Sequence, residues 1–330
     1  MAALPMSAGA RIRAFRHAHT GAAVIALVEP LVATDGFPYA ADQVAEYAQV
    51  VDADLVAWMN PASSWLLDRL CQRLPADVRR RAAPGIDTWA VHSLGARRNT
   101  TPEATAHVLQ TILTLVRTGV LTADSRTIQA VLRRIEAPDR APTPETRHQR
   151  MTMILIVSIM PHPPTGALAR VITQYDALDG HATDPHLETR ILRHQAADET
   201  VWLAAITGPR AVNRMGILPS AAYESRAVRL RAWPLVAEGG WPTLVQNLLP
   251  RIRDVDELRA ALPFCAQVAP LEVFTFLKDA PASLVAGLTR ADLTPLFVHA
   301  ADTIDSLEIL TWWGHRPAAA SPRRPAGVRR

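Results

Sequence analysis

The stretch LEVFTFLK, residues 271–278, returns as LEILTWWG at residues 307–314, which is 36 positions later. Both copies open with Leu-Glu, continue with apolar residues and carry Thr at the fifth position. A segment that recurs at an interval of about 20 to 50 residues is typical of helical repeat proteins. The echo therefore predicts that Leu271 and Leu307 occupy equivalent positions in two stacked helix pairs.

The C-terminal third divides into three predicted helix pairs, and the two similar segments lie in the second and third of them. The pairs are 226–239 with 241–252, 255–268 with 269–280, and 290–303 with 305–315. Leu258 and Cys265 of the second pair match Leu293 and Ala300 of the third at a shift of 35. Each pair carries an apolar stripe that it cannot cover alone, so we expect the pairs to stack in a row.

Residues 293–313, LTPLFVHAADTIDSLEILTWW, resemble a degenerate ankyrin repeat. Thr294-Pro295-Leu296 match the family's motif, Phe297 stands where His is usual, and a Leu-Glu pair opens the second helix. The resemblance implies protein recognition, with no catalysis and no cofactor. The pattern departs from the family in its uneven spacing and in lacking the glycine-rich finger turn after Ala266. HEAT-like or tetratricopeptide-like repeats and a non-repetitive bundle are the alternatives.

Helix boundaries are clear in the middle of the chain. Thr101 and Thr143 are each followed by Pro and Glu, which predicts N-caps with Pro at the first helical position. Gly119 is placed to end the first of these helices in the left-handed conformation. The run MTMILIVSIM, residues 151–160, is apolar nearly all round, so its helix should lie between neighbours.

We therefore predict an all-α protein, an irregular α-solenoid of stacked antiparallel helix pairs that is ankyrin-like toward the C-terminus. Strand-like alternation of apolar and polar residues is scarce along the chain. The predicted segments are a basic N-terminal segment or first helix at 1–28, a helical-hairpin region at 29–225, ankyrin-like repeats at 226–313 and a disordered Arg/Pro tail at 314–330.

The positive charge is concentrated at the two ends. Of 35 basic residues only Lys278 is a lysine, a bias that GC-rich coding explains most simply. Residues 1–28 hold three Arg and residues 314–330 hold five, with no acid in either segment. Removing these eight charges from the formal net charge of +4 leaves −4 for residues 29–313. The N-terminal end is typical either of an organelle transit peptide or of an ordinary first helix.

The apolar runs and the cysteines indicate an intracellular protein. The longest apolar run, residues 151–160, is shorter than the roughly 18 residues that a membrane-spanning helix requires. Cys71 and Cys265 form neither a disulfide framework nor a metal motif, which favours two core residues in a reducing compartment. We expect no membrane span, and the oligomeric state is open.

Motifs for catalysis are missing from the sequence. It contains no nucleophile elbow, no phosphate-binding loop, no dinucleotide fingerprint and no zinc-protease motif. The densest polar cluster is HATDPHLETRILRH, residues 181–194, in which Asp184-Pro185 reads as a helix start. Arg190 between His186 and His194 would repel a metal ion. We therefore expect no enzyme, no metal and no cofactor; an enzyme with an unrecognised helical fold is the least favoured alternative.

The favoured function is a non-enzymatic scaffold for protein–protein interaction. The candidate contact residues are three tryptophans and five arginines: Trp241, Trp312, Trp313, Arg79, Arg80, Arg81, Arg323 and Arg324. Large aromatic residues serve as interface anchors or as core fillers between repeats. The alternative function is a helical-repeat subunit of an RNA–protein assembly that contacts phosphates through its basic ends.

Overall fold

The computed structural model describes residues 6–59, 64–95, 101–137, 143–178, 184–300 and 304–315. Within these ranges helices are the only regular secondary structure, and no strand occurs, which confirms the all-α prediction. The chain divides into two compact units, Met1–Ala196 and Ala197–Arg330. The sequence interpretation had divided the chain at residue 225 instead. Arg323 and Arg324 lie outside the described residues.

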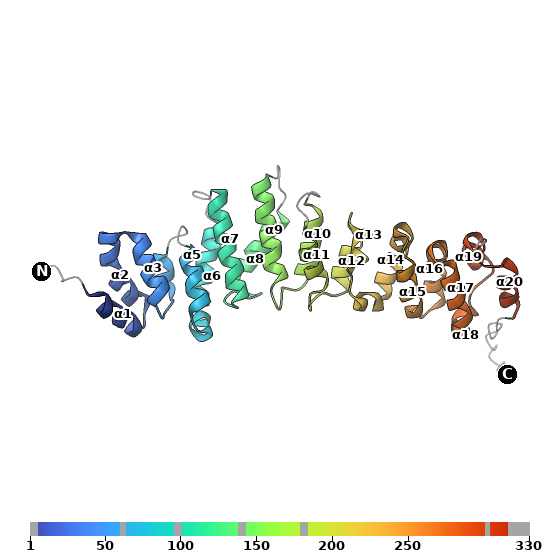
Figure 1. The fold of residues 1–330 in the computed structure, drawn as a ribbon, viewed down its shortest axis with the longest axis horizontal. Helices are drawn as coiled ribbons and strands as arrows, with labels where there is room; N and C mark the ends of the chain where they lie inside the picture. Colours follow the sequence, from blue (N-terminus) through green and yellow to red (C-terminus); the bar gives the residue numbers. More distant parts are fainter. Residues whose placement is uncertain are drawn as a thin grey trace, which may run out of the picture. The chain divides into compact units, whose positions relative to one another are not determined.

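Unit 1 is built from helices of 6 to 20 residues (Figure 1). They are α1 (Ala8–His17), α2 (Gly21–Asp35), α3 (Phe37–Tyr47), α4 (Ala53–Trp58), α5 (Ser64–Arg73), α6 (Ala76–Gly95), α7 (Pro102–Arg117), α8 (Arg126–Glu136), α9 (Pro144–Ser158), α10 (Ala167–Asp176) and α11 (Pro185–Leu192). The expected boundary at residue 28 falls inside α2, which continues through Pro30 because Val28 and Leu31 on either side of it are both buried.

Unit 2 contains shorter helices and several 3-10 turns. They are α12 (Glu199–Ala205), α13 (Ala211–Arg214), η3 (Ser220–Glu224), α14 (Arg226–Gly239), α15 (Pro242–Leu248), η4 (Leu249–Arg251), α16 (Val255–Val268), α17 (Pro270–Asp279), α18 (Ala282–Val285), η5 (Ala291–Leu293), α19 (Thr294–His299) and α20 (Ser306–His315). Helices occur at all three predicted pairs. The short α18 was not predicted, because one turn of helix after Pro281 leaves no measurable apolar period.

The predicted helix caps are present in unit 1. The hydroxyl of Thr101 accepts a hydrogen bond from the backbone N–H of Ala104, and Thr143 forms a reciprocal capping box with Thr146. Gly119 follows α7 with a φ of 72°, in the left-handed region. These caps satisfy backbone groups at the helix ends that have no partner within the helix. The local sequence therefore set these boundaries correctly.

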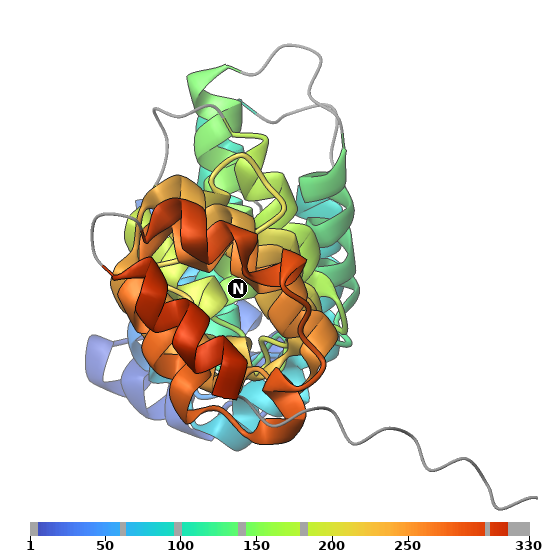
Figure 2. The same ribbon diagram turned by 90° about the vertical axis from the view of Figure 1, so that its right-hand side faces the viewer.

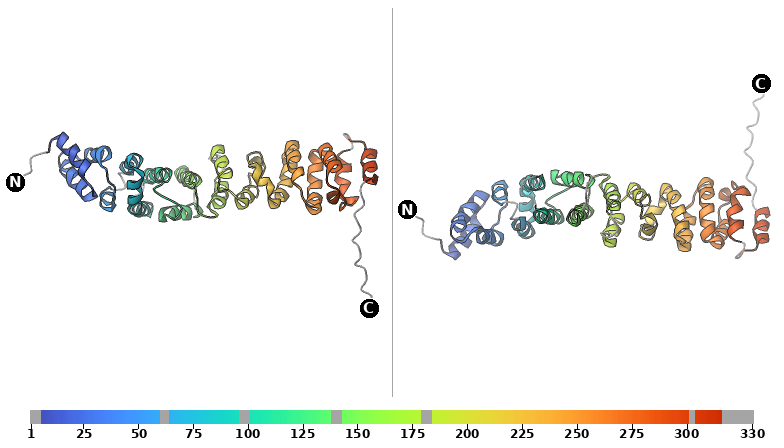
Figure 3. Two further views of the ribbon diagram at one scale, coloured as in Figure 1. Left: turned by 90° about the horizontal axis from the view of Figure 1, so that it is seen from below. Right: turned by 90° about the horizontal axis from the view of Figure 1, so that it is seen from above.

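Each long helix packs against the helix two positions along the chain as well as against its immediate neighbour. In unit 1, α7 packs against α5 and α9, while α6 packs against α4 and α8. In unit 2, α14 packs against α12 and α16, and α17 packs against α15 and α19. Figure 3 shows successive helices of each unit lying side by side. This arrangement covers the apolar stripe of one helix with the stripes of its neighbours.

The apolar helix α9 lies between several neighbours, as its composition predicts. It packs against α7, α8, α10 and α11. Met153, Ile154, Ile156 and Val157 are buried, and Leu155 between them is half-buried. A helix that is apolar on all sides is stable only where neighbours surround it.

The echoed segments occupy α17 and α20 and are equivalent in their local environments at three positions. Leu271 and Leu307 are both exposed near the helix start, whereas Val273 and Ile309 are both buried. Thr275 and Thr311 each donate a hydroxyl hydrogen bond to the carbonyl four residues earlier, at 2.9 and 2.7 Å. The equivalence ends at the fourth position, where Phe274 is buried and its counterpart is exposed.

Polar contacts join the second helices of consecutive pairs. Gln246 of α15 donates to the carboxylate of Glu272 at 3.2 Å, and Lys278 of α17 lies 3.3 Å from the carboxylate of Glu308. Glu272 and Glu308 are the second residues of the two echoed segments. The repeated Glu therefore accepts from the preceding second helix in both cases, although Gln246 and Lys278 stand at different positions of their helices.

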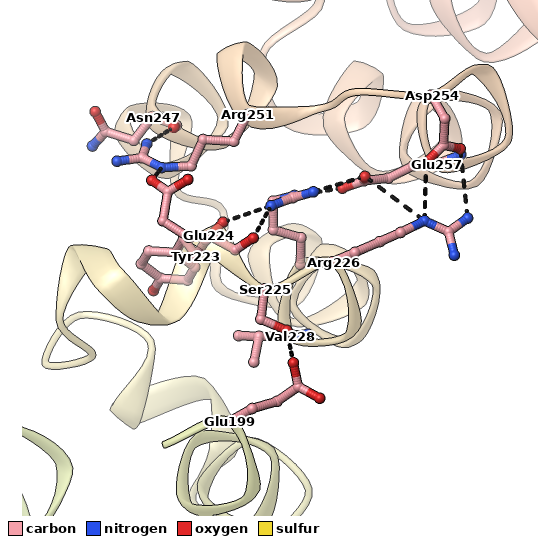
Figure 4. A network of polar contacts seen from close by, with 11 residues as sticks. Glu199, Tyr223, Glu224, Ser225, Arg226, Val228, Asn247, Arg251, Asp254 and Glu257 are labelled. Atoms are coloured by element: carbon pink, nitrogen blue, oxygen red, sulfur yellow. Dashed lines mark hydrogen bonds and ion pairs between the residues drawn. The ribbon is translucent and has the colours of Figure 1, made fainter. Parts of the chain in front are cut away.

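The first helices of two pairs are joined by a buried ion pair (Figure 4). The guanidinium of Arg229 on α14 donates two hydrogen bonds to the carboxylate of Glu257 on α16, at 2.5 and 2.8 Å. Its remaining donors reach the carbonyls of Tyr223 and Glu224 at 2.8 and 2.9 Å. Both charged side chains are almost completely buried. A guanidinium with this many partners fixes the positions of α14, η3 and α16 relative to each other.

An exposed pair lies beside this buried one. Asp254, the N-cap of α16, accepts a hydrogen bond from the backbone N–H of Glu257 at 2.8 Å, and Arg226 donates to the same carboxylate at 3.0 Å. The backbone hydrogen bond from Glu257 is the main cause that holds the pKa of Asp254 below its ordinary value. Burial opposes this shift, and the hydrogen bond and charge of Arg226 add to it.

Replacing Glu257 by Ala should destabilise unit 2 by about 3–5 kcal/mol, because the guanidinium of Arg229 stays buried without its carboxylate partner. Asp256→Ala is the matched control: Asp256 is exposed and pairs with Arg259 at the surface, so its loss should cost about 0–1 kcal/mol. Urea unfolding of the full-length variants measures both. Equal losses of stability in the two variants would show that the buried ion pair contributes no more to folding than the exposed pair does.

Asp254→Asn should make stability less dependent on pH. A carboxyl whose pKa is lowered by folding contributes stability above its unfolded pKa of about 3.9, and the contribution is lost as pH falls through the native value. Asn keeps the N-cap but not the charge. The urea midpoints of the two proteins should differ by a constant amount from pH 5 to 7, and the difference should shrink as pH falls below the unfolded pKa of about 3.9. A difference that persists undiminished at pH 2 would contradict the assignment.

Candidate functional site

The predicted tryptophan pair lies on α20 and faces α17. Trp312 packs edge-on against Phe274, with ring centroids 5.9 Å apart and planes at 84°. Trp313 lies 6.3 Å from Trp312 at an angle of 54°. Both tryptophans are half-buried. Trp312 therefore holds the last described helix against its neighbour, in the role of a packing residue between consecutive pairs.

Trp241 stands apart from this pair and has a local role. It precedes α15, and its ring covers Gly239: a Cβ built at that glycine would lie 2.8 Å from three ring carbons. Gly240 between them has a φ of 62°, which reverses the chain direction. No ring contact in the described part of unit 2 joins Trp241 to Trp312. Trp241 thus closes the turn between α14 and α15.

The three predicted arginines of α6 are used in three different ways. Arg79 is half-buried and donates to the carbonyl of Cys71 at 2.8 Å, across the turn from α5. Arg81 lies 3.3 Å from the carboxylate of Asp77 one turn earlier. Arg80 is exposed. The cluster seen in the sequence is therefore divided between a helix cap, a surface ion pair and one exposed guanidinium.

An exposed apolar face on α20 was missed by the sequence analysis. Of the seven large hydrophobic side chains exposed in the described residues, four belong to unit 2: Leu271, Val298, Leu307 and Leu310. Leu307 is 67% exposed and Leu310 is 40% exposed, and their spacing of three places them on one side of the helix. We call these two residues the outer face of α20. Figure 2 shows α20 among the helices of unit 2 nearest the viewer.

The sequence pattern alone does not explain why this face of α20 is exposed. Leu310 corresponds by the shift of 36 to Phe274, which α20 itself covers. Among the described residues no helix follows α20 to cover Leu310 in the same way. The signal that could have identified it is the position of α20 as the last helix in the described part of the chain, where no described neighbour follows.

A hollow in unit 1 lies between α4 and α6. Its volume is about 840 Å³, and its walls include Val56, Met59, Trp89 and Val91. The hydroxyl of Thr88 in its wall already donates to the carbonyl of Pro84 at 3.0 Å. Its size is that of a small-molecule site. The lining also includes His92 and Ser93, but most of it is apolar, which suits an apolar side chain or ligand.

The polar cluster of residues 181–194 makes local hydrogen bonds in its described part, residues 184–194. Asp184 caps α11, as predicted, accepting from the backbone N–H of His186 at 2.8 Å. The Nε2 atom of His194 lies 2.8 Å from the carbonyl oxygen of Met160, and its Nδ1 accepts from the N–H of Ala196. This pair of contacts requires the neutral Nε2–H tautomer and engages both ring nitrogens. His181 lies outside the described residues.

Both cysteine thiols are buried in the protein. Burial raises the pKa of Cys71 and of Cys265 to about 12, so both stay protonated at neutral pH. Among the described residues no group of three or more His, Cys, Asp or Glu side chains is arranged to hold a metal ion. In the same residues, no helix combines the length and the apolar character needed to cross a bilayer.

Comparison of the chain with protein-family models, with curated proteins and with solved structures finds no match. The likeness of residues 293–313 to an ankyrin repeat therefore stays a prediction from sequence. The function has to be argued from the packing, exposure and charge of this chain's own residues.

Replacing Trp312 by Ala should destabilise unit 2 by about 2 kcal/mol, less than the 3–5 kcal/mol typical of a fully buried Trp, because the ring is half-buried. Leu307→Ala should change stability by no more than about 0.5 kcal/mol, since its side chain is exposed. Thermal unfolding of both variants measures the contrast. A larger loss from Leu307→Ala would place that leucine in the packing core instead.

Proposed function

We propose that the protein is a non-enzymatic helical-repeat scaffold that binds another protein through the outer face of α20. Stacked antiparallel helix pairs, an irregular α-solenoid, would present this face at the end of a row. The packing of each helix against the one two positions along supports the solenoid arrangement. The matched contacts of Glu272 and Glu308 support a true repeat between α17 and α20.

The observation that carries the proposal is the exposure of Leu307 and Leu310 together. Terminal units of repeat arrays are generally soluble because their outer side is polar. Here two leucines one turn apart occupy that side instead. Apolar area left in water contributes about 25 cal/mol per Å² when a partner covers it, so such a face favours association.

The contact between α17 and α20 indicates what kind of partner surface would fit. In α17, Phe274 is covered by the edge of Trp312, and Lys278 pairs with Glu308. Leu310 is the counterpart of Phe274. A partner helix with an aromatic residue in the position of Trp312 would cover Leu310 in the same manner. The proposed partner is therefore a protein that offers an amphipathic helix.

A photo-crosslinking residue at position 310 tests this proposal in the full-length chain, expressed in the cells that encode it. The expected result is a discrete protein adduct, which is identified, purified and titrated against the chain. The double variant Leu307→Glu and Leu310→Glu should weaken its binding by at least about tenfold, the effect of 1.4 kcal/mol. Tyr39→Glu, a substitution at an exposed aromatic residue of unit 1, should leave binding unchanged.

Two outcomes would contradict the proposal. A crosslinker at position 39 that captures the same proteins as one at 310 would show non-specific adhesion. Adducts of nucleic acid in place of protein, with an affinity that falls by orders of magnitude between about 50 and 200 mM salt, would favour the RNA–protein alternative. Removing residues 314–330 separates the contribution of the Arg-rich end from that of α20 in either case.

A further inference from the structure

A hollow of about 600 Å³ lies in unit 1 where the C-terminal end of α9 meets α11. His186, Thr189, Arg190 and Arg193 border it, and none of its lining residues is an Asp or a Glu. These four residues are spaced at steps of three and four, which places them on one side of α11. The hollow is thus bordered by two permanent positive charges and two imidazoles, that of His194 included, with no carboxylate in its wall.

Two of the bordering side chains have donors without a protein partner. His186 and Arg190 are exposed, and in the described part of the chain neither side chain makes a hydrogen bond or an ion pair. Arg190 therefore presents a guanidinium with five N–H donors beside the hollow. Four positions earlier on the helix, His186 adds an imidazole that also faces the hollow.

Three backbone carbonyls at the end of α9 accept hydrogen bonds from groups other than these two side chains. At the end of α9, the carbonyl of Met160 lies 2.8 Å from Nε2 of His194, and that of Pro161 accepts from Gln195 at 2.8 Å. The carbonyl of Leu155 accepts from the hydroxyl of Ser158 at 2.9 Å. Arg190 makes none of these hydrogen bonds. Its guanidinium donors therefore face solvent or a ligand.

We infer that this hollow binds a small phosphorylated molecule, with Arg190 as its principal contact. A planar guanidinium matches two oxygens of a phosphate group, and a wall without carboxylates does not oppose the negative charge. A metal cation is disfavoured by Arg190 and Arg193. A nucleic-acid strand would need basic groups along a track, whereas here the positive charge is gathered at one hollow. The inference is independent of the proposed role of α20.

Titration of the full-length protein with pyrophosphate, with inorganic phosphate and with a single-stranded RNA oligonucleotide tests the inference at low salt by calorimetry. Arg190→Gln should weaken pyrophosphate binding by about tenfold, since a hydrogen bond to a charged group contributes about 1.5–3 kcal/mol. The matched control is Arg80→Gln, the same change at an exposed arginine on α6, which should leave the affinity within about twofold. Hydrogen exchange should show protection of residues 184–195 on binding.

Each result decides the question. Saturable pyrophosphate binding that Arg190→Gln weakens and Arg80→Gln does not supports the site. Equal weakening by both substitutions would show general charge attraction, and protection elsewhere in the chain would place the site elsewhere; both overturn the inference. Binding of RNA without binding of pyrophosphate or phosphate would also overturn it and would favour a nucleic-acid partner. Because Arg190 is exposed, the variant should fold, which its unfolding temperature checks.

Discussion

Shielding of apolar helix stripes from water is the constraint on which the rest of this structure depends. A single helix pair leaves one side uncovered, so each long helix packs against the helix two positions along, in both units. The rule explains why α9, apolar on every side, has four neighbouring helices. It also explains why α20 keeps Leu307 and Leu310 exposed, because no described helix follows it. The same constraint therefore accounts for the packing of the helices and for the exposure of the proposed interaction surface on α20.

Several arginine side chains support this helix packing through hydrogen bonds and ion pairs within the chain. Arg229 is buried with Glu257, Arg226 joins the cap of α16, and Arg79 closes the end of α5. These guanidiniums bind carboxylates and carbonyls of the chain itself, so they are not available for phosphates. The high arginine content is therefore weak evidence for nucleic-acid binding. Arg190 differs from these three, because its exposed side chain makes no hydrogen bond or ion pair in the described part of the chain.

Sequence reasoning succeeded where the deciding interactions are short in range. The caps at Thr101, Thr143 and Asp184 are hydrogen bonds between residues two or three positions apart, and they appear where the sequence placed them. It failed to locate the exposed apolar face. Leu307 is apolar and belongs to a repeated segment, but its exposure depends on which side of α20 meets α17. That choice is made by the contacts of Ile309 and Trp312 with neighbours, which no local pattern encodes.

The amino-acid sequence by itself determined the helical class and the helix ends at Thr101, Gly119, Thr143 and Asp184, because caps, prolines and apolar periodicity act within a few residues. The tertiary structure alone decided how each polar and apolar side chain is used. It joined Arg229 to Glu257 across 28 positions, divided Arg79, Arg80 and Arg81 among separate roles, and left the outer face of α20 open. The physical reason is that burial and ion pairing depend on which helices meet, and that is set by the packing of whole helices.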